Sequence, residues 1–301
     1  MRKHIIRVLT FLLICVPLSA SAIETREELR AMYRAIYAFE GRSPYDEQPQ
    51  VTAPYSLGRI NAEAQREALE YLNFLRALAD LPPVATNDVY SFECQHGAVL
   101  MAALDDVEHT LPQPDDMDDS FYTEASAALA SSNIARFNWM RPNILKESIS
   151  YFMRDDGEDN LSALGHRRWL LNPSMGKTGF GLANSATGMT YIALYAHDMS
   201  EPDTTRGEVY WPSGGVFPVE LMHGHLAWSI MLEPELYDLA GSNVIVELEE
   251  TVSGARFSFH CSEGFGNGFC TVNRQSYGGG DCLIFRPELE EAGFTDYLQN
   301  Q

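Results

Sequence analysis

The chain has 301 residues, of which 42 are Asp or Glu and 21 are Lys or Arg, so its formal net charge is −21. Such an acidic chain repels nucleic acid and anionic membrane surfaces, and we expect neither as a partner. The length allows one large or two ordinary domains, each with its own apolar core, and a change of composition near residue 200 favours two.

Residues 1–22 have the three regions of a secretory signal peptide. Arg2, Lys3 and Arg7 precede an apolar run over 8–18, and small side chains at 20–22 form a cleavage site. The run is shorter than the roughly 20 residues that a membrane-spanning helix needs, and no later segment is long and charge-free enough. We therefore expect an exported protein, secreted or periplasmic, with no membrane span.

Residues 23–57 predict a helix followed by an irregular arm. Thr25 and Glu28 form a capping box ahead of apolar residues at helical spacing, so a helix should begin there. Pro44, Pro49 and Pro54 then interrupt a segment that has no periodicity. This composition indicates an arm that runs over the surface.

Helices are predicted over 64–79, 88–106, 144–153 and 161–171 from apolar side chains at helical intervals. Pro82 and Pro83 should end the first, because proline lacks a backbone donor. His96 shares the apolar face of the second, so we expect a hydrogen-bonded core residue there and not a ligand. The aspartates of 115–119 lack the alternating order of a calcium loop and predict a solvated loop.

Strands are predicted from residue 178 onward. Runs over 178–183 and 189–196 flank the turn residues 184–188, which is typical of a hairpin, and helices before a short antiparallel sheet indicate a layered α+β domain. After a polar linker at 198–206, short β-type runs with glycine-rich turns predict a small all-β, immunoglobulin-like sandwich. These runs cover residues 209–211, 244–248, 256–261, 269–272 and 282–286.

Four cysteines follow the leader, and disulfides persist in the oxidising surroundings of an exported chain. Cys261, Cys270 and Cys282 lie close together in sequence, whereas Cys94 is distant and lies in a predicted helix. We expect one bridge among the last three and a buried free thiol at Cys94, although sequence alone does not fix the pairing.

Several motifs in order resemble those of a known family. They are Leu72-Asn73-Phe74-Leu75-Arg76 with Leu81-Pro82-Pro83-Val84, the run from Gln95 to His109-Thr110, Ser131-Ser132-Asn133-Ile134-Ala135, and Gly165-His166-Arg167-Arg168-Trp169. On these residues, the segment 64–196 resembles the CAP superfamily of cysteine-rich secretory, antigen 5 and pathogenesis-related proteins, in its bacterial branch. The resemblance implies an α-β-α sandwich, which we place at 58–198, followed by the β-sandwich at 207–290.

The resemblance also implies a cleft with two histidines and two acidic residues, sometimes occupied by a metal. His109 and His166 match the histidine positions, but Ser132 stands at the first acidic position and Asp155 lies near the second. Asn133 and Arg167 complete the expected cleft. Zinc accepts imidazole and carboxylate ligands, so His109, His166 and Asp155 are the candidate set for zinc, the possible cofactor.

Two functions follow from this cleft. With an acidic position lost, we favour a non-catalytic binding or interaction module for a lipid, a glycan or a protein, and six aromatic residues would suit a groove. These are Tyr122, Phe137, Trp139, Tyr151, Trp169 and Tyr191. The alternative is a metal-assisted hydrolase, so whether the protein is an enzyme stays open.

Three further patterns carry less weight. A nucleophile at Ser131 or Ser132 activated by His109 would lack the usual glycine-framed elbow. His223-Gly224-His225 has no third ligand at metal spacing and predicts a surface loop or strand end. Internal ion pairs are the simplest expectation for Arg167 and Arg168.

Overall fold

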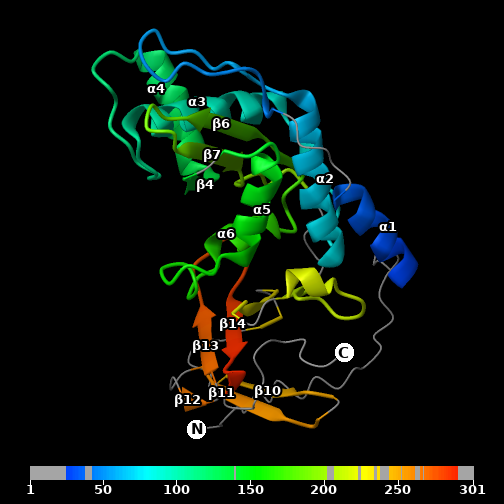
Figure 1. Cartoon of the computed structure of the whole chain (residues 1–301). Coiled ribbons are helices and arrows are strands. Elements are labelled where there is room, and N and C mark those ends of the chain that lie inside the picture. Colours follow the sequence, from blue (N-terminus) through cyan, green and yellow to red (C-terminus); the bar gives the residue numbers. More distant parts are fainter. Residues whose placement is uncertain are drawn as a thin grey trace.

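The computed structural model describes residues 25–37, 43–138, 140–201, 207–222, 225–233, 236–237, 244–251, 253–261, 265–266 and 268–290. The expected leader at 1–22, Trp139 and the His223-Gly224 pair lie outside these ranges. Figure 1 shows a helical upper part that encloses one sheet and a smaller lower part made of strands. None of the helices within the described ranges combines the length and apolar character that crossing a bilayer needs.

A three-stranded antiparallel sheet forms the middle layer of the upper part, in the order β4-β7-β6. Its strands are β4 (Ser132–Phe137), β6 (Phe180–Asn184) and β7 (Thr190–Tyr195). The predicted hairpin is therefore confirmed as β6 and β7, with the turn residues between them.

Helices cover both faces of this sheet (Figure 1). On one side lie α3 (Asp88–Leu104) and α4 (Asp119–Ala130), and on the other lie α2 (Ala62–Leu78), α5 (Ile144–Arg154) and the short α6 (Gly165–Leu170). Side chains alternate along β7, because Tyr191 belongs to the core under α3 whereas Ile192 belongs to the core under α2 and α5. The α-β-α sandwich expected from the resemblance is present.

Local capping explains where the first helices begin. Thr25 and Glu28 form the predicted capping box of α1 (Arg26–Tyr37), with reciprocal hydrogen bonds of 3.1 Å. The side-chain oxygen of Asn61 accepts from the first turn of α2, and that of Asn87 accepts from the first turn of α3. Each cap satisfies backbone donors that the helix itself leaves unpaired.

Short strands border the sandwich. Within the arm, β1 (Tyr45–Glu47) pairs with β2 (Arg59–Ile60), which follows the arm, so the segment expected to be irregular supplies one strand of a small antiparallel pair. The hydroxyl of Tyr45 donates to the side-chain oxygen of Asn184 at 2.8 Å and so ties the arm to the end of β6. A parallel pair joins β3 (Ala85–Thr86) to β5 (Lys177–Thr178).

The C-terminal part consists of two sheets, in the orders β13-β14-β9-β8 and β10-β11-β12. Its elements are β8 (Val209–Trp211), the 3₁₀ helix η1 (Val219–Leu221), β9 (Trp228–Met231), β10 (Ile245–Glu249), β11 (Arg256–His260), β12 (Phe265–Gly266), β13 (Gly268–Asn273) and β14 (Cys282–Pro287). The prediction of an α+β chain with a small all-β C-terminal part is confirmed.

Both faces of the four-stranded sheet are covered. Leu283 and Phe285 on β14 pack with Phe259 in the core shared with the three-stranded sheet. Cys282 and Ile284 on the same strand point the other way, into the core formed with α2 and α5. The C-terminal sheet is therefore fused to the helical layer by a common apolar core.

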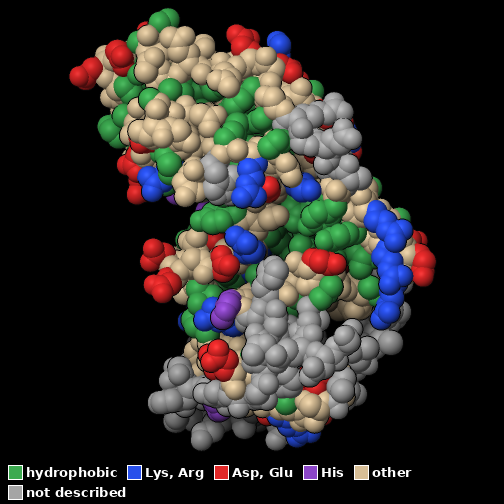
Figure 2. Space-filling model, viewed as in Figure 1, with side chains coloured by type: hydrophobic (Ala, Val, Ile, Leu, Met, Phe, Trp, Pro, Cys, Tyr) green, Lys and Arg blue, Asp and Glu red, His purple; other side chains and the backbone are tan. Residues whose placement is uncertain are grey.

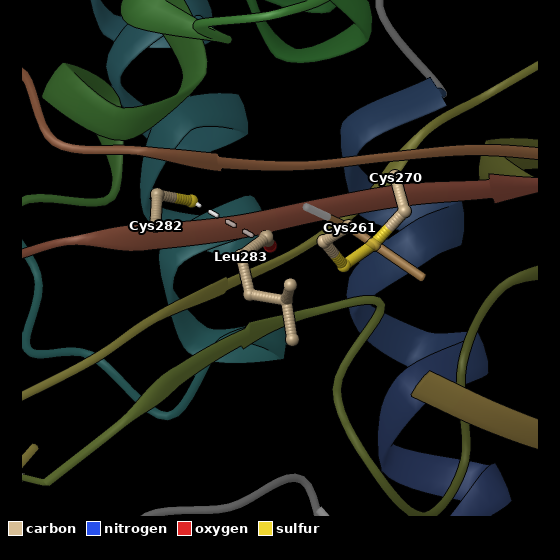
Figure 3. Close-up of a disulfide and its surroundings, with 4 residues drawn as sticks. All are labelled: Cys261, Cys270, Cys282 and Leu283. Atoms are coloured by element: carbon tan, nitrogen blue, oxygen red, sulfur yellow. Dashed lines mark hydrogen bonds between the residues drawn. A yellow bond between two sulfur atoms is a disulfide. The ribbon is translucent and has the colours of Figure 1, made fainter. Parts of the chain in front are cut away.

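The cysteines have the expected distribution. Cys261, just after β11, forms a disulfide with Cys270 on β13, so the bridge joins the two sheets (Figure 3). Cys94 and Cys282 are free and buried, and burial raises the pKa of their thiols to about 12 and about 11. Both thiols are therefore protonated at neutral pH, and the prediction of one bridge with a buried thiol at Cys94 is confirmed.

Several elements differ from the sequence predictions. The helix α4 was not predicted, because its buried residues are the small Ala125 and Ala128 with Leu129, which give a weak apolar pattern. The helix α6 begins at Gly165 instead of 161, since turns precede it and Leu164 adopts a left-handed φ of 47°. The strands β4 and β9 also lay outside the predicted β-type runs.

Candidate functional site

A cavity of about 730 Å³ opens beside α6, between the start of β4 and the turns that precede α6. Figure 2 shows the surface hollowed at its left edge between the upper part and the parts below. The walls are mostly polar side chains, together with two aromatic rings. They include Ser132, Asn133, Asp159, Asn160, Ser162 and Gln275 among the polar residues, and Trp169 and Tyr277 as the aromatic ones.

Three histidines line this cavity. His109 comes from the segment after α3 and His166 from the first turn of α6, so the two histidines singled out in the sequence face the same space. His197, which follows β7, is a third member that the sequence analysis missed. The available signal was its position directly after a predicted strand, where side chains commonly reach a site.

Asp155 lies behind His166 and does not line the cavity. It ends α5 in a left-handed conformation, and its side chain is fully buried. Oδ1 is 2.8 Å from Nδ1 of His166, and Oδ2 accepts from the backbone N–H of His166 at 3.0 Å. Because a carboxylate only accepts, Nδ1 carries the proton and Nε2 is left as the acceptor nitrogen of this ring.

The other two imidazoles are held by different contacts. Nδ1 of His109 lies 2.7 Å from the carbonyl oxygen of Leu129, which requires a proton on Nδ1 and leaves Nε2 as an acceptor. The ring of His197 packs against that of Trp169 at a centroid distance of 4.0 Å, with the two ring planes tilted by 32°. Burial, and to a smaller extent the nearby His109, lower the pKa of His197 and favour its neutral form.

Ser132 and Asn133 bring β4 to the cavity. Oγ of Ser132 lies 3.4 Å from Sγ of the buried Cys94. Either atom can donate in this contact, so the thiol of Cys94 is a hydrogen-bond partner for the Ser132 hydroxyl. The side-chain amide of Asn133 donates to the carbonyl oxygen of His166 at 3.0 Å, so it fastens α6 to the sheet.

Arg167 does not take the position expected for it in the cleft. Its side chain is fully buried and donates to the carbonyl oxygens of Met153, Arg154 and Ala227, which join the end of α5 to the C-terminal sheet. Arg168 is buried as well, and its acceptors include the carbonyl oxygen of Gly280. Backbone carbonyls, and not the expected carboxylates, account for these contacts.

Most of the expected groove aromatics have structural roles. Tyr191 and Phe137 are buried, Tyr122 donates to the carbonyl oxygen of Leu111, and Tyr151 packs edge-on against Phe137. Trp169 lines the cavity. His96 is 6% exposed with Nδ1 at 2.8 Å from the carbonyl oxygen of Phe92, as expected for a core residue.

The candidate zinc set does not fit this arrangement as a whole. Asp155 uses one oxygen on the ring of His166 and the other on backbone N–H groups, so it is not directed at the cavity. Across the described ranges, no three His, Cys, Asp or Glu side chains gather in a way that could hold a metal ion. His109 and His166 nevertheless each leave Nε2 as an acceptor, which is the orientation that metal-binding histidines adopt.

Asp155→Ala is expected to lower the free energy of unfolding by about 1–3 kcal/mol, because it strips the buried Nδ1–H of His166 and two backbone N–H groups of their acceptor. Urea denaturation measures the loss. Asp155→Asn is the control, since asparagine tolerates the left-handed backbone and keeps one acceptor oxygen. Equal stability of Asp155→Ala and wild type would contradict this role.

Residues 69–195 match the model of the cysteine-rich secretory protein family, CAP. This range begins in α2 and ends at the last residue of β7, so it covers the central sheet and the helices on both of its faces. It also includes His109 and His166, whereas His197 and the C-terminal sheets follow it. No curated protein matches the chain.

Proposed function

We propose that this CAP-domain protein is an exported, non-catalytic binding module whose cavity takes a neutral, polyhydroxylated ligand such as an oligosaccharide. The observation that carries the proposal is the lining of the cavity, which combines hydroxyl, amide and imidazole groups with the ring of Trp169. Of the lipid, glycan and protein ligands that the sequence left open, a glycan matches this lining best.

The polar groups favour hydroxyl-rich ligands over lipids. Asn160 and Ser162 line the cavity beside the histidines, and amides and hydroxyls both donate and accept hydrogen bonds. A lipid tail would leave these groups without partners, at a cost for each one. A ligand with many hydroxyl groups can satisfy them, and a cavity of about 730 Å³ is in the usual range for small ligands.

An aromatic surface is the second support. The ring of Trp169 is supported at the cavity wall by the ring of His197, which packs against it at a tilt of 32°. Indole rings present a flat apolar face with a polar edge. Such a face suits the C–H side of a sugar ring, while the hydroxyls of the sugar reach the polar groups around it.

Charge argues for a neutral ligand. Asp159 lies in the cavity wall, and the chain as a whole carries a formal net charge of −21. A negative field lowers the local concentration of anionic ligands, including nucleic acids and acidic sugars.

Export is supported by the predicted leader and by the Cys261–Cys270 disulfide, because disulfides persist mainly in oxidising compartments.

Trp169→Ala is expected to weaken binding of a neutral oligosaccharide by about tenfold, because it removes the stacking surface. Calorimetric titration with maltotetraose and with tetraacetylchitotetraose measures the affinity. Tyr151→Ala is the control, since Tyr151 is an exposed aromatic residue on α5 that does not line the cavity.

Wild-type protein that binds neither oligosaccharide, but takes up phosphatidylcholine from vesicles, would overturn the glycan proposal. A Trp169→Ala variant that folds and binds with wild-type affinity would also count against it, because the aromatic surface would then carry no ligand.

A metal-assisted hydrolase remains the second candidate, favoured by the Nε2 atoms that His109 and His166 both leave as acceptors. The engagement of Asp155 behind His166 counts against it. Titration with zinc alone separates the two candidates. Stoichiometric binding that His109→Ala abolishes would support the hydrolase, and the absence of heat would remove it.

A further inference from the structure

We propose that the turn 274–280, between β13 and β14, forms the second wall of the binding cavity and selects its ligand through Tyr277 and Gln275. This inference rests on the proposed glycan-binding function and deepens it. The match to the CAP family ends at residue 195, so this wall is supplied by a part of the chain that lies outside the family domain.

The turn lies at the same cavity as the histidines. Gln275, Ser276 and Tyr277 line it together with His166 and Trp169. The ring of Tyr277 lies over Gly165, where the position of a Cβ atom would be 3.5 Å from the ring. In Figure 1, β13 runs upward and β14 runs back down antiparallel to it, so the turn between them lies at their upper ends, just below α6.

Arg168 on α6 holds the turn in place. Its guanidinium donates to the carbonyl oxygens of Gln275 and Gly280, close to the two ends of the turn, and to Oδ1 of Asn273 at 2.8 Å. The same group lies 5.3 Å from the centroid of the Tyr277 ring, within the range of a cation–π contact. One buried side chain on α6 therefore fixes both the backbone of the turn and its aromatic ring.

Gly278 makes this close approach possible. Its φ is +62°, and a Cβ atom at this position would lie 2.4 Å from the carbonyl oxygen of Arg168. The backbone of the turn thus rests directly on the backbone of α6. Such a preorganised wall binds its ligand without the cost of ordering a loop first.

The chemistry of the wall complements that of the CAP domain. Trp169 supplies an aromatic surface from α6, and Tyr277 supplies another from the C-terminal sheet, with a hydroxyl at its edge. The exposed amide of Gln275 offers a donor and an acceptor, which suits a pair of sugar hydroxyls or an acetamido group. Residues that face a ligand from a second element determine which substituents fit.

The test uses the full-length protein and calorimetric titration with maltotetraose and tetraacetylchitotetraose. Tyr277→Ala and Gln275→Ala are each expected to weaken the tighter of the two by about tenfold and to change the ratio of the two affinities. Tyr237→Ala is the matched control, because Tyr237 is a partly exposed tyrosine of the C-terminal part that does not line the cavity. Wild-type affinities and an unchanged ratio in both cavity variants would overturn the inference.

A second readout keeps this inference separate from the glycan proposal. If wild-type protein binds neither sugar, the glycan proposal fails. The position of the turn beside α6 is then tested by the NMR chemical shift of the Gly165 amide. Loss of the ring current in Tyr277→Ala should shift that resonance, whereas Tyr237→Ala should not. An unshifted Gly165 resonance would overturn the wall itself. If Tyr277→Ala does not fold, ligand selection is tested by the oligosaccharide affinities of Gln275→Ala alone, because this substitution is at an exposed position.

Discussion

Gly181→Ala is expected to lower the free energy of unfolding by about 3 kcal/mol or more, at the upper end of overpacking in a core. Gly181 lies on β6 directly under α3, where a Cβ atom would be 1.9 Å from the carbonyl oxygen of Cys94 and 2.2 Å from its carbonyl carbon. Both atoms belong to the backbone. Because no side chain can swing away, the helix and the strand themselves must separate.

Urea denaturation measures this loss, and Gly157→Ala is the matched control. A Cβ atom at Gly157 would meet only the side-chain amide of Asn160, at 3.8 Å, so we expect little change there. If the two variants unfold at the same urea concentration, then α3 and β6 do not lie in direct backbone contact.

The same close contact explains how α3 is aligned with the sheet. Gln95 on α3 donates to the carbonyl oxygen of Leu182 at 2.8 Å and accepts from its N–H at 2.9 Å, so its side chain pairs with β6 as a neighbouring strand would. Since β6 is an edge of the three-stranded sheet, this amide satisfies backbone groups that would otherwise be open. The alignment also sets the path of the chain that leaves α3 and carries His109 to the cavity.

Features encoded by neighbouring residues could be predicted from the sequence. The capping box at Thr25 and Glu28, the helix that ends ahead of Pro82, and the hairpin around 184–188 each depend on side chains a few positions apart. The strand β4 depends instead on its pairing with β7, some 60 positions away, and has no strong local pattern. Tertiary pairing defines it.

The site residues likewise include some that the sequence could identify and some that only the structure reveals. His109 and His166 were accessible through the resemblance to the CAP family, because their motifs are local. Tyr277 reaches the cavity because the four-stranded sheet packs against α2 and α5. This packing places the turn between β13 and β14 next to α6. The role of Asp155 was also hidden, since only the geometry shows whether a carboxylate faces a cavity or supports a histidine from behind.

Two buried arginines donate to backbone carbonyl oxygens at the ends of helices. Arg76 donates to the carbonyl oxygen of Leu170, the last residue of α6, and to that of Asn172 beyond it, and Arg167 donates to the carbonyl oxygens at the end of α5. The last carbonyls of a helix have no partner within it and lie at the negative end of its dipole. A guanidinium satisfies several of them at once and gains a favourable field for its charge, which reduces the cost of its burial.

Arg168→Met is therefore expected to lower the free energy of unfolding by about 3 kcal/mol, because it leaves partly buried oxygens of Asn273, Gln275 and Gly280 without their donor. Methionine is long enough to fill much of the space, so the loss reports on hydrogen bonds more than on packing. Urea denaturation of the variant measures it. The variant should also lose oligosaccharide affinity, since the turn that carries Tyr277 is no longer held.

Arg154→Met is the matched control for this change. Arg154 is about half exposed, its carboxylate partner Asp156 lies 3.9 Å away, and an exposed pair of this kind contributes at most about 1 kcal/mol. Arg168→Lys separates charge from geometry, because a lysine keeps the positive charge but its single nitrogen cannot span acceptors on both ends of the turn. If Arg168→Lys is as stable as wild type, the positive charge alone holds the turn. If Arg168→Lys loses most of the stability that Arg168→Met loses, the forked shape of the guanidinium is what joins the C-terminal sheet to α6.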